Sequence, residues 1–142
     1  MAGYMTKLNG HVYNGEFLSN EPLENGVFAE INAGTVRKIQ AAKDTEFRVV
    51  EKTTLWGMDA VVLEVISTGK DEVFFVENEW DINDAEVYDT AKYTLPKGKF
   101  VKMHRPTVGE QLIMTVTNEV LETLTVGNKA QPDNGGTVKA AV

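Results

Sequence analysis

The segment from residue 107 to residue 138 restricts the possible folds more than any other part of the chain. Residues 112–117, Leu-Ile-Met-Thr-Val-Thr, alternate so that one face of an extended backbone is apolar and the other becomes polar toward its end. This period of two is that of a β-strand, whose successive side chains point to opposite faces. The segment closes on Asp-Asn-Gly-Gly at 133–136, residues that accept positive φ and suit a tight hairpin turn. The pattern predicts a small antiparallel β unit.

A repeated turn frames this unit. Residues 107–110 are Thr-Val-Gly-Glu, and residues 125–128 are Thr-Val-Gly-Asn. Glycine beside a polar residue is typical of turns that start or separate short strands. We therefore expect a turn at each copy and treat the rest of the chain as built around this unit.

Other segments have the composition of short strands, namely residues 27–32, 35–40, 47–51, 60–66 and 72–76. Residues 35–40 also fit one or two helical turns, but the β-branched Thr35, Val36 and Ile39 favour a strand. We expect residues 60–76 to form a core hairpin and residues 52–59 to be a connection. Many short strands with glycine-rich turns, and no convincing amphipathic helix, indicate an all-β fold, a small antiparallel β-sandwich or barrel.

Residues 1–26 have no sustained period. Asn-Gly pairs interrupt them, yet they carry several apolar side chains. We interpret them as an extended N-terminal arm that lies across either the chain's own body or a neighbouring molecule. Residues 27–142 are expected to form the β domain, with two lobes and a break near residues 96–106 as the alternative to a single body. A chain of 142 residues is long enough for one real core.

The composition excludes several classes of protein. No cysteine is present, which removes disulfide frameworks, cysteine nucleophiles and thiolate metal sites. A formal net charge of -7 argues against a nucleic-acid binder. No apolar run approaches the roughly 20 residues that cross a bilayer, and the first residues lack the layout of a signal peptide. We expect a protein made inside the cell that binds neither nucleic acid nor membrane.

The residue types that carry catalysis do not form a recognisable motif. The serines are Ser19 and Ser67, and the histidines are His11 and His104. None of the four lies in a nucleophile-elbow pattern, and we interpret His104 as a polar or interface residue. The acidic segment 77–89 fails the spacing of an EF-hand, so a solvated loop is the interpretation. We therefore predict no enzyme activity, no catalytic or metal-binding residues and no cofactor.

A basic stretch follows the acidic segment. Residues 92–105 contain lysines, a histidine and an arginine but no acid. Lysines interleaved with aromatic residues contact phosphates and stack bases in some nucleic-acid binders, but an acidic protein partner suits the same charges. Exposed ion pairs contribute only ~0.2–1 kcal/mol each, so these charges would orient docking while buried apolar contacts hold it.

Several short motifs resemble those of the small decoration (cement, head-stabilising) proteins of tailed bacteriophages. They are Val-Phe-Phe-Val-Glu-Asn-Glu at 73–79, Tyr-Thr-Leu-Pro-Lys-Gly at 93–98, Val-Gly-Glu at 108–110, Val-Gly-Asn at 126–128 and the opening Asn-Gly-Val at 25–27. The resemblance covers about Asn25 to Val142, and neither residues 1–24 nor the exact segment 77–90 is matched.

The resemblance implies a virion protein, made in the host cytoplasm, that binds the outside of an icosahedral phage head and performs no chemistry. It would bridge and stabilise major capsid subunits, and contacts between its own copies stay open. The contact residues that we expect are Tyr4, Leu8, Tyr13 and Phe17 of the arm, and Lys97, Lys99, Lys102 and Arg105 of the basic stretch.

Two alternatives stay open. The first is another phage structural subunit, from the tail, the neck or the head-completion complex. The second is a carbohydrate-binding β-sandwich that stacks sugars on Trp56 and Trp80, although tryptophans also serve as core and interface residues.

Overall fold

The structure, a computed structural model, describes residues 4–6, 11–55, 57–77 and 94–141, with residues 4–6 and 11–16 as backbone only. The strands are β1 (Tyr4–Thr6), β2 (His11–Ser19), β3 (Leu23–Glu24), β4 (Phe28–Asn32), β5 (Thr35–Lys38), β6 (Glu46–Leu55), β7 (Met58–Ser67), β8 (Phe74–Val76), β9 (Thr94–Leu95), β10 (Phe100–Arg105), β11 (Gln111–Thr115), β12 (Lys129–Asp133) and β13 (Thr137–Ala140). The helix α1 spans Asn118–Thr123. The prediction of an all-β fold is confirmed.

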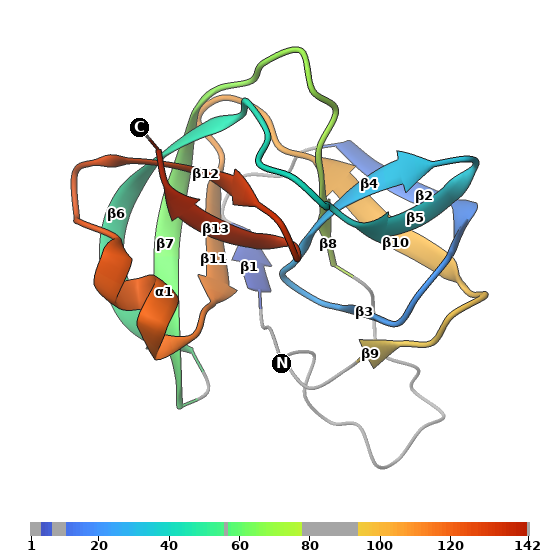
Figure 1. The fold of residues 1–142 in the computed structure, drawn as a ribbon, viewed down its shortest axis with the longest axis horizontal. Coiled ribbons are helices and arrows are strands. Elements are labelled where there is room, and N and C mark those ends of the chain that lie inside the picture. Colours follow the sequence, from blue (N-terminus) through green and yellow to red (C-terminus); the bar gives the residue numbers. More distant parts are fainter. Residues whose placement is uncertain (1–3, 7–10, 56, 78–93, 142) are drawn as a thin grey trace.

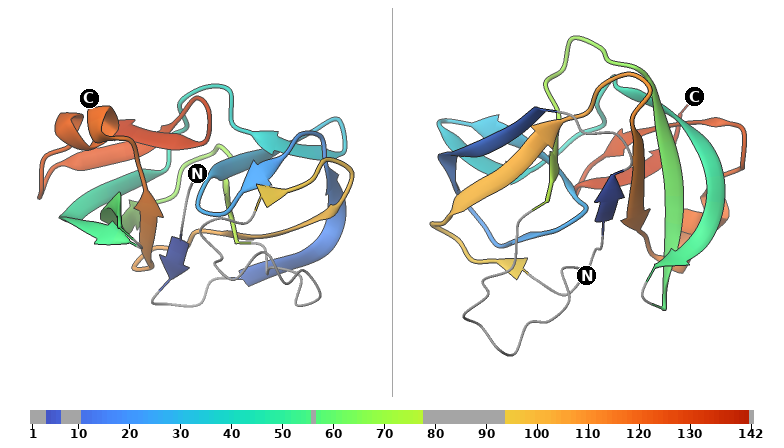
Figure 2. Two further views of the ribbon diagram at one scale, coloured as in Figure 1. Left: turned by 90° about the horizontal axis from the view of Figure 1, so that it is seen from below. Right: turned by 180° about the vertical axis from the view of Figure 1, so that it is seen from behind.

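The strands form two lobes that lie side by side (Figure 1), and two further views keep them apart (Figure 2). One lobe is a six-stranded sheet in the order β1-β11-β7-β6-β12-β13. The other is a closed barrel in the order β10-β2-β5-β4-β8, beside which β3 and β9 pair as a small separate sheet. In the barrel β2 and β5 run parallel, whereas the other described strand pairs are antiparallel.

The chain passes back and forth between the lobes. It starts in the sheet with β1, builds β2, β4 and β5 of the barrel, returns for β6 and β7, completes the barrel with β8 and β10, and ends in the sheet. The last passage lies at residues 106–110, directly after the predicted break near 96–106. Neither lobe is therefore a continuous stretch of sequence.

The N-terminal residues belong to both lobes. Tyr4 pairs with Met114, which places β1 at the edge of the six-stranded sheet. Strand β2 pairs with β10 on one side and with β5 on the other, so it closes the barrel. The described part of residues 1–26 thus lies on the chain's own sheets. The described part of the arm therefore does not extend onto a neighbouring molecule. Its backbone groups already pair with strands of the same chain.

Two hydrophobic cores result from this arrangement. The barrel core contains Leu23, Val27, Ala29, Val36, Phe74, Val76, Leu95, Val101 and Met103. The first core lies against the six-stranded sheet and also includes Phe28 of β4 and Phe75 of β8. In β8, Phe75 faces the first core while its two neighbours face the barrel core, as the period of two requires. The wall formed by β4 and β8 is therefore shared by the two cores.

Two local predictions are wrong. Residues 60–76 do not form a hairpin, because β7 pairs with β6 and β11 while β8 pairs with β4 and β10. The loop between them is held by Asp44, whose carboxylate accepts hydrogen bonds from the backbone N–H groups of Lys70 (2.8 Å) and Asp71 (3.0 Å). Residues 52–59 are not a connection either, since Leu55 pairs with Met58 at the end of a long β6–β7 hairpin.

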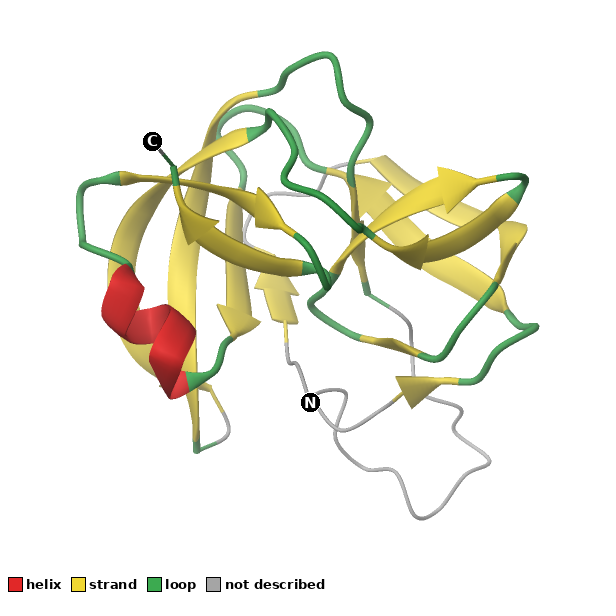
Figure 3. Cartoon of the chain, in the orientation of Figure 1, coloured by secondary structure: helices red, strands yellow, loops and turns green. Residues whose placement is uncertain are grey.

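The helix was not expected from the sequence. Figure 3 shows α1 beside the six-stranded sheet. Thr117 caps its N-terminus by accepting a hydrogen bond from the backbone N–H of Val120 (3.2 Å), and Val120 and Leu121 pack against the first core. A helix of six residues is too short to show a clear helical period in the sequence.

The repeated turn is confirmed, and both copies make the same hydrogen bonds. The N–H of Glu110 donates to the carbonyl of Thr107, and that of Asn128 donates to the carbonyl of Thr125, each at 3.0 Å. The middle glycines have φ of 92° and 90°, which a residue with a side chain rarely adopts. Each glycine N–H also donates to a strand of the sheet, at Val65 of β7 and Val49 of β6. The repeat is therefore a structural device that fastens β11 and β12 to their neighbours.

The predicted turn at 133–136 is also confirmed, and it connects the lobes. Asp133 pairs with Thr137 across the β12–β13 hairpin. The carbonyl of Gly136 accepts a hydrogen bond from Phe28 N–H (2.8 Å), and Gly135 N–H donates to the carbonyl of Ile39 (2.8 Å). A turn of the sheet thereby attaches to the wall of the barrel.

We expect Gly136→Ala to destabilise the protein more than Gly135→Ala. Both glycines have positive φ (81° and 88°), so each alanine carries a similar backbone penalty of about 1–2 kcal/mol. A Cβ at position 136 would lie 2.9 Å from the carbonyl oxygen of Phe28, whereas one at 135 has nothing within 4 Å. The additional steric cost at position 136 should be about 1–3 kcal/mol in urea unfolding. Equal losses for the two variants would contradict the close approach of the hairpin to β4.

Candidate functional site

The described part of the basic stretch, residues 94–105, consists of β9, β10 and the turn between them, which lies at one end of the barrel. Proline begins this turn at residue 96, and Gly98 adopts a φ of 84°. The end of β2 holds the turn through two backbone hydrogen bonds, from Gly98 N–H to the carbonyl of Ser19 (2.9 Å) and from Ser19 N–H to the carbonyl of Lys99 (2.8 Å). Residues 96–98 thus form a turn that is fastened to the end of β2.

Ser19 fixes the turn with its side chain as well. It is 3% exposed, and its hydroxyl donates to the carbonyl of Pro96 (2.8 Å) and accepts from Lys99 N–H (3.3 Å). The hydroxyl therefore acts as both donor and acceptor toward backbone groups, which gives this serine a structural role. It determines where the lysines on either side of Gly98 stand.

Two large apolar side chains are exposed beside this turn. Phe100 is 62% exposed, Leu18 is 41% exposed, and the two residues are directly paired between β10 and β2. Cross-strand partners on one face lie close enough to form a joint surface. Lys97 and Lys99 are also exposed. We call Leu18, Lys97, Lys99 and Phe100 the barrel-end patch.

The lysines of this patch have no acidic partner among the described residues, unlike most cations there. Ion pairs join Arg37 and Lys43 to Glu30, Lys38 to Glu24, Arg48 to Glu64, Arg105 to Glu72, Lys129 to Glu46 and Lys139 to Asp133. Among the other described cations, only Lys52 on β6 and Lys70 in the loop after β7 share this feature. The barrel-end patch is therefore a local positive surface on a chain of net charge -7.

The other predicted contact residues are not part of this patch. Arg105 is paired with Glu72 and lies over the ring of Phe74 (5.7 Å to its centroid), and Lys102 is half-buried. Phe17 packs against the barrel core, because it points inward where its neighbour Leu18 points outward. Tyr13 and Tyr4 lie in β2 and β1, whose backbone alone is described there. Leu8, Trp56, Trp80 and the acidic residues 78–89 lie outside the described residues.

A buried ionic cluster lies at the junction of the lobes. His104 of β10 is 1% exposed and Glu110 is fully buried. Protonated His104 donates from Nε2 to Glu110 Oε2 (2.5 Å) and from Nδ1 to Glu77 Oε1. Glu110 Oε1 also accepts from Thr107 N–H (3.1 Å). His104 was interpreted as a polar or interface residue; the structure shows it as a buried polar residue enclosed by carboxylates 27 and 6 residues away in the sequence.

The cluster keeps His104 protonated. Burial of the ring opposes the charged form, but hydrogen bonds to Glu110 and Glu77 and attraction to both carboxylates outweigh it, raising the pKa of His104 to about 9. Phe75 covers one side of the ring with an edge-to-face contact (5.9 Å between centroids). The backbone carbonyl of Glu110 also accepts a hydrogen bond from the N–H of Val65 in β7 (2.9 Å). The cluster therefore links the barrel to the sheet.

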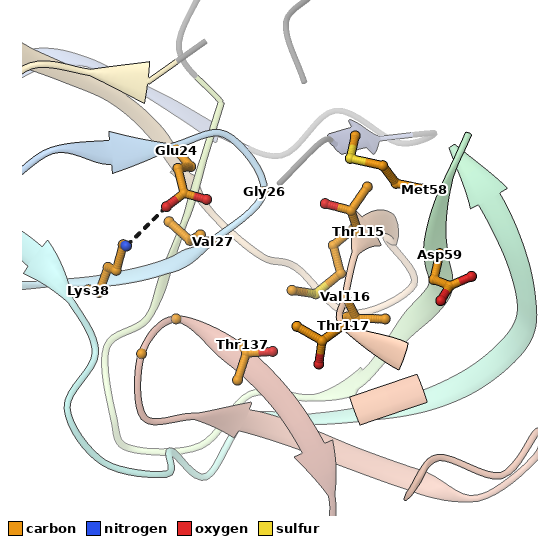
Figure 4. Close-up of a pocket in the computed structure, with 13 residues that line it drawn as sticks. Glu24, Gly26, Val27, Lys38, Met58, Asp59, Thr115, Val116, Thr117 and Thr137 are labelled. Atoms are coloured by element: carbon orange, nitrogen blue, oxygen red, sulfur yellow. Dashed lines mark hydrogen bonds and ion pairs between the residues drawn. The ribbon is translucent and has the colours of Figure 1, made fainter. Parts of the chain in front are cut away.

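A cleft lies between the lobes (Figure 4). Its volume is about 390 Å³. Glu24 and Lys38 form an ion pair on its barrel side (3.2 Å), and Asp59 and Thr115 lie on its sheet side. Partial burial opposes ionisation of Glu24, but its hydrogen bond and attraction to Lys38 hold its pKa below the ordinary value. No histidine or serine lines the cleft. The described lining therefore holds no serine–histidine pair.

Other types of site are not evident in the described part of the chain. No group of three or more histidine or acidic side chains there is arranged to hold a metal ion. No helix among these residues has the length and apolar character needed to cross a bilayer.

Comparison of the chain with models of protein families, with curated proteins and with solved structures finds no match. The assignment of function therefore depends on the surfaces of this molecule and on the motifs described above.

We expect the stability of the protein to fall as the pH rises from about 6.5 to 9. The pKa of His104 is about 9 in the folded chain against 6.5 for an ordinary histidine, so its contribution is complete below pH 6.5 and lost above pH 9. This difference corresponds to about 3 kcal/mol. Urea unfolding at a series of pH values measures it, with His104→Gln expected to remove the dependence. A dependence that survives in His104→Gln and disappears in His11→Gln would contradict the assignment.

We expect Ser19→Ala to lower the free energy of unfolding by about 1–2 kcal/mol, because the Pro96 carbonyl and the Lys99 N–H lose a partly buried hydrogen-bond partner. Ser67→Ala is the matched control, since Ser67 is exposed at the end of β7 and should change stability by less than about 0.5 kcal/mol. Thermal or urea unfolding distinguishes the two. Similar small effects for both would show that the turn at 96–99 does not depend on the hydroxyl.

Proposed function

We propose that the protein is a virion structural protein, a capsid decoration or cement protein that binds the outer surface of an icosahedral phage head. The observation that carries the proposal is the barrel-end patch, which combines exposed apolar side chains with two lysines that no described acid neutralises. This patch contains Lys97 and Lys99, two of the residues for which the phage resemblance implied a capsid contact. Its charge and apolar character suit an acidic protein surface.

The remaining surfaces support this proposal over an enzyme. The buried cluster is closed off at the junction of the lobes, and the described lining of the cleft contains neither a serine nor a histidine. A structural protein needs rigid surfaces rather than reactive groups. The shared wall of the two cores supplies that rigidity, because the lobes cannot separate without exposing large aromatic side chains.

The patch alone is a small contact, but a decoration protein acts in many copies. A specific interface buries about 1,000 Å² or more, so further parts of the surface must contribute beside the patch. When one molecule contacts two subunits, the second contact is intramolecular and the combined affinity exceeds that of either contact. A protein of this kind would hold neighbouring major capsid subunits together without any chemical step.

The proposal is tested with phage heads that lack the protein. Purified chain is added at a series of concentrations, and the bound copies per head are counted on quantitative gels and by electron microscopy. We expect many copies spread over the outside of the head and greater resistance of the heads to heat. Failure to bind heads, or a few copies confined to the tail or neck, would contradict a decoration role.

The charge contribution has its own variants. Lys97→Glu with Lys99→Glu should weaken head binding by about tenfold, since each exposed charge pair contributes up to about 1 kcal/mol and reversal adds repulsion. Lys52→Glu with Lys70→Glu makes the same change of net charge on other elements and should leave binding within about twofold. An equal loss in both double variants would mean that only net charge matters.

A further inference from the structure

The outward position of Phe100 is not explained by the needs of the fold. Along β10, Val101 and Met103 are 1% exposed and belong to the barrel core, while Phe100 is 62% exposed. Single exposed apolar residues are ordinary on protein surfaces. Here a second one, Leu18, is its direct cross-strand partner. An aromatic and an aliphatic side chain displayed together on a strand pair form a surface that water solvates poorly.

The backbone beneath this pair is held rigidly. Phe100 directly follows the turn at 96–99. Ser19 holds this turn with four hydrogen bonds, of which two involve its backbone and two its hydroxyl. Strand β2 is bonded on its other side to β5, where Leu18 pairs with Thr35. The β10–β2 register also shifts between Phe100 and Lys102, an irregularity of the kind that changes the direction of side chains at the rim of a barrel. A surface prepared in this way loses little conformational entropy when it binds.

The charges around the pair indicate the kind of partner. Lys97 and Lys99 are exposed and have no acidic neighbour among the described residues, so a partner gains from negative charge around the apolar contact. Nucleic acid is disfavoured by the net charge of -7. A two-fold contact between copies of this chain through the patch would place the lysines of both molecules against each other. An acidic surface of another protein is the occupant that these charges favour.

We propose that Leu18 and Phe100 form the anchor of the protein's contact with its partner, inserting into an apolar depression bordered by acidic residues, while Lys97 and Lys99 set the orientation. This inference rests on the proposed function in taking the major capsid protein as that partner. It adds the residues that hold the contact together. Aromatic residues at the centre of a contact, surrounded by polar groups that exclude water, commonly account for most of the binding energy.

The variants Phe100→Ser and Leu18→Ser test the anchor on intact heads. Loss of a dominant aromatic contact of about 2 kcal/mol or more corresponds to an affinity at least about thirtyfold lower for Phe100→Ser. For Leu18→Ser we expect about tenfold. Val108→Ser and Val126→Ser are matched controls, because these valines are 64% and 54% exposed in the two Thr-Val-Gly turns, and binding should change by less than about twofold.

The salt dependence separates the anchor from the lysines. Raising the salt concentration should weaken head binding by the same factor for Phe100→Ser and for the unchanged protein, because the charges are intact in both. The variant with glutamate at positions 97 and 99 should lose or invert that dependence. Each variant is first shown to unfold in urea at the same midpoint as the unchanged protein. If the unchanged protein binds heads and Phe100→Ser binds equally well, the anchor is refuted while the decoration role stands.

A photo-cross-linking variant tests the anchor even if heads are not the partner. With Phe100→p-benzoylphenylalanine, irradiation of assembled virions should give a cross-link to an acidic protein. The cross-link should disappear when Lys97 and Lys99 are changed to glutamate and should be absent with Val126→p-benzoylphenylalanine. A product of this kind with a tail or neck protein would refute the decoration role but support the anchor. Cross-links to nucleic acid, to a second copy of the chain or to nothing would overturn the anchor.

Discussion

The fold depends on β8 and the start of β4, which are buried on both faces. Phe28 of β4 stacks on Phe47 of the sheet (5.3 Å between centroids) and packs against Phe75 of β8 (5.4 Å), while the opposite faces of β4 and β8 fill the barrel. Each large buried side chain contributes roughly 1.5–3 kcal/mol by leaving water. Because the same wall serves two cores, the barrel and the sheet stabilise each other, and neither has a complete core of its own.

The ionic cluster lies against this wall, and its pairing also favours one alignment of the strands over others. Burying a charge is costly unless it is paired, and a paired buried charge often stabilises no more than an apolar core would. The pairing of His104 with Glu77 and Glu110 instead determines how the strands align. It aligns β10 with the segment that enters β11, and a shifted register would leave a carboxylate without a partner. Separation of this cluster from the barrel-end patch allows binding and folding to be altered independently.

The sequence allowed local features to be predicted and left the distant ones undetermined. The alternation in β11, the two Thr-Val-Gly turns and the hairpin turn at 133–136 were predictable because each is determined by neighbouring residues. The strand at 74–76 was assigned to the wrong partner, because its place depends on a loop that Asp44, far away in the sequence, holds in shape.

The same distinction applies to the candidate site. Lys97 and Lys99 were identified as contact residues from their charge, because a run of lysines can be recognised in the sequence without knowing how the strands pair. The exposure of Leu18 beside Phe100 depends on the pairing of β2 with β10, and no pattern within either segment reveals it. Phe17 was assigned to a contact surface because its apolar character fits an interface as well as a core. The alternation of Phe17 and Leu18 on β2 decides between them.

The alternating path of the chain also has a mechanical consequence. Along the described elements the backbone crosses four times between the barrel and the sheet, at the steps β1–β2, β5–β6, β7–β8 and β10–β11. A load applied to one lobe is therefore divided among several covalent strands instead of falling on a single linker. Separating the two lobes by force would therefore strain several chain segments at once. This arrangement gives a protein without disulfides additional resistance to mechanical unfolding.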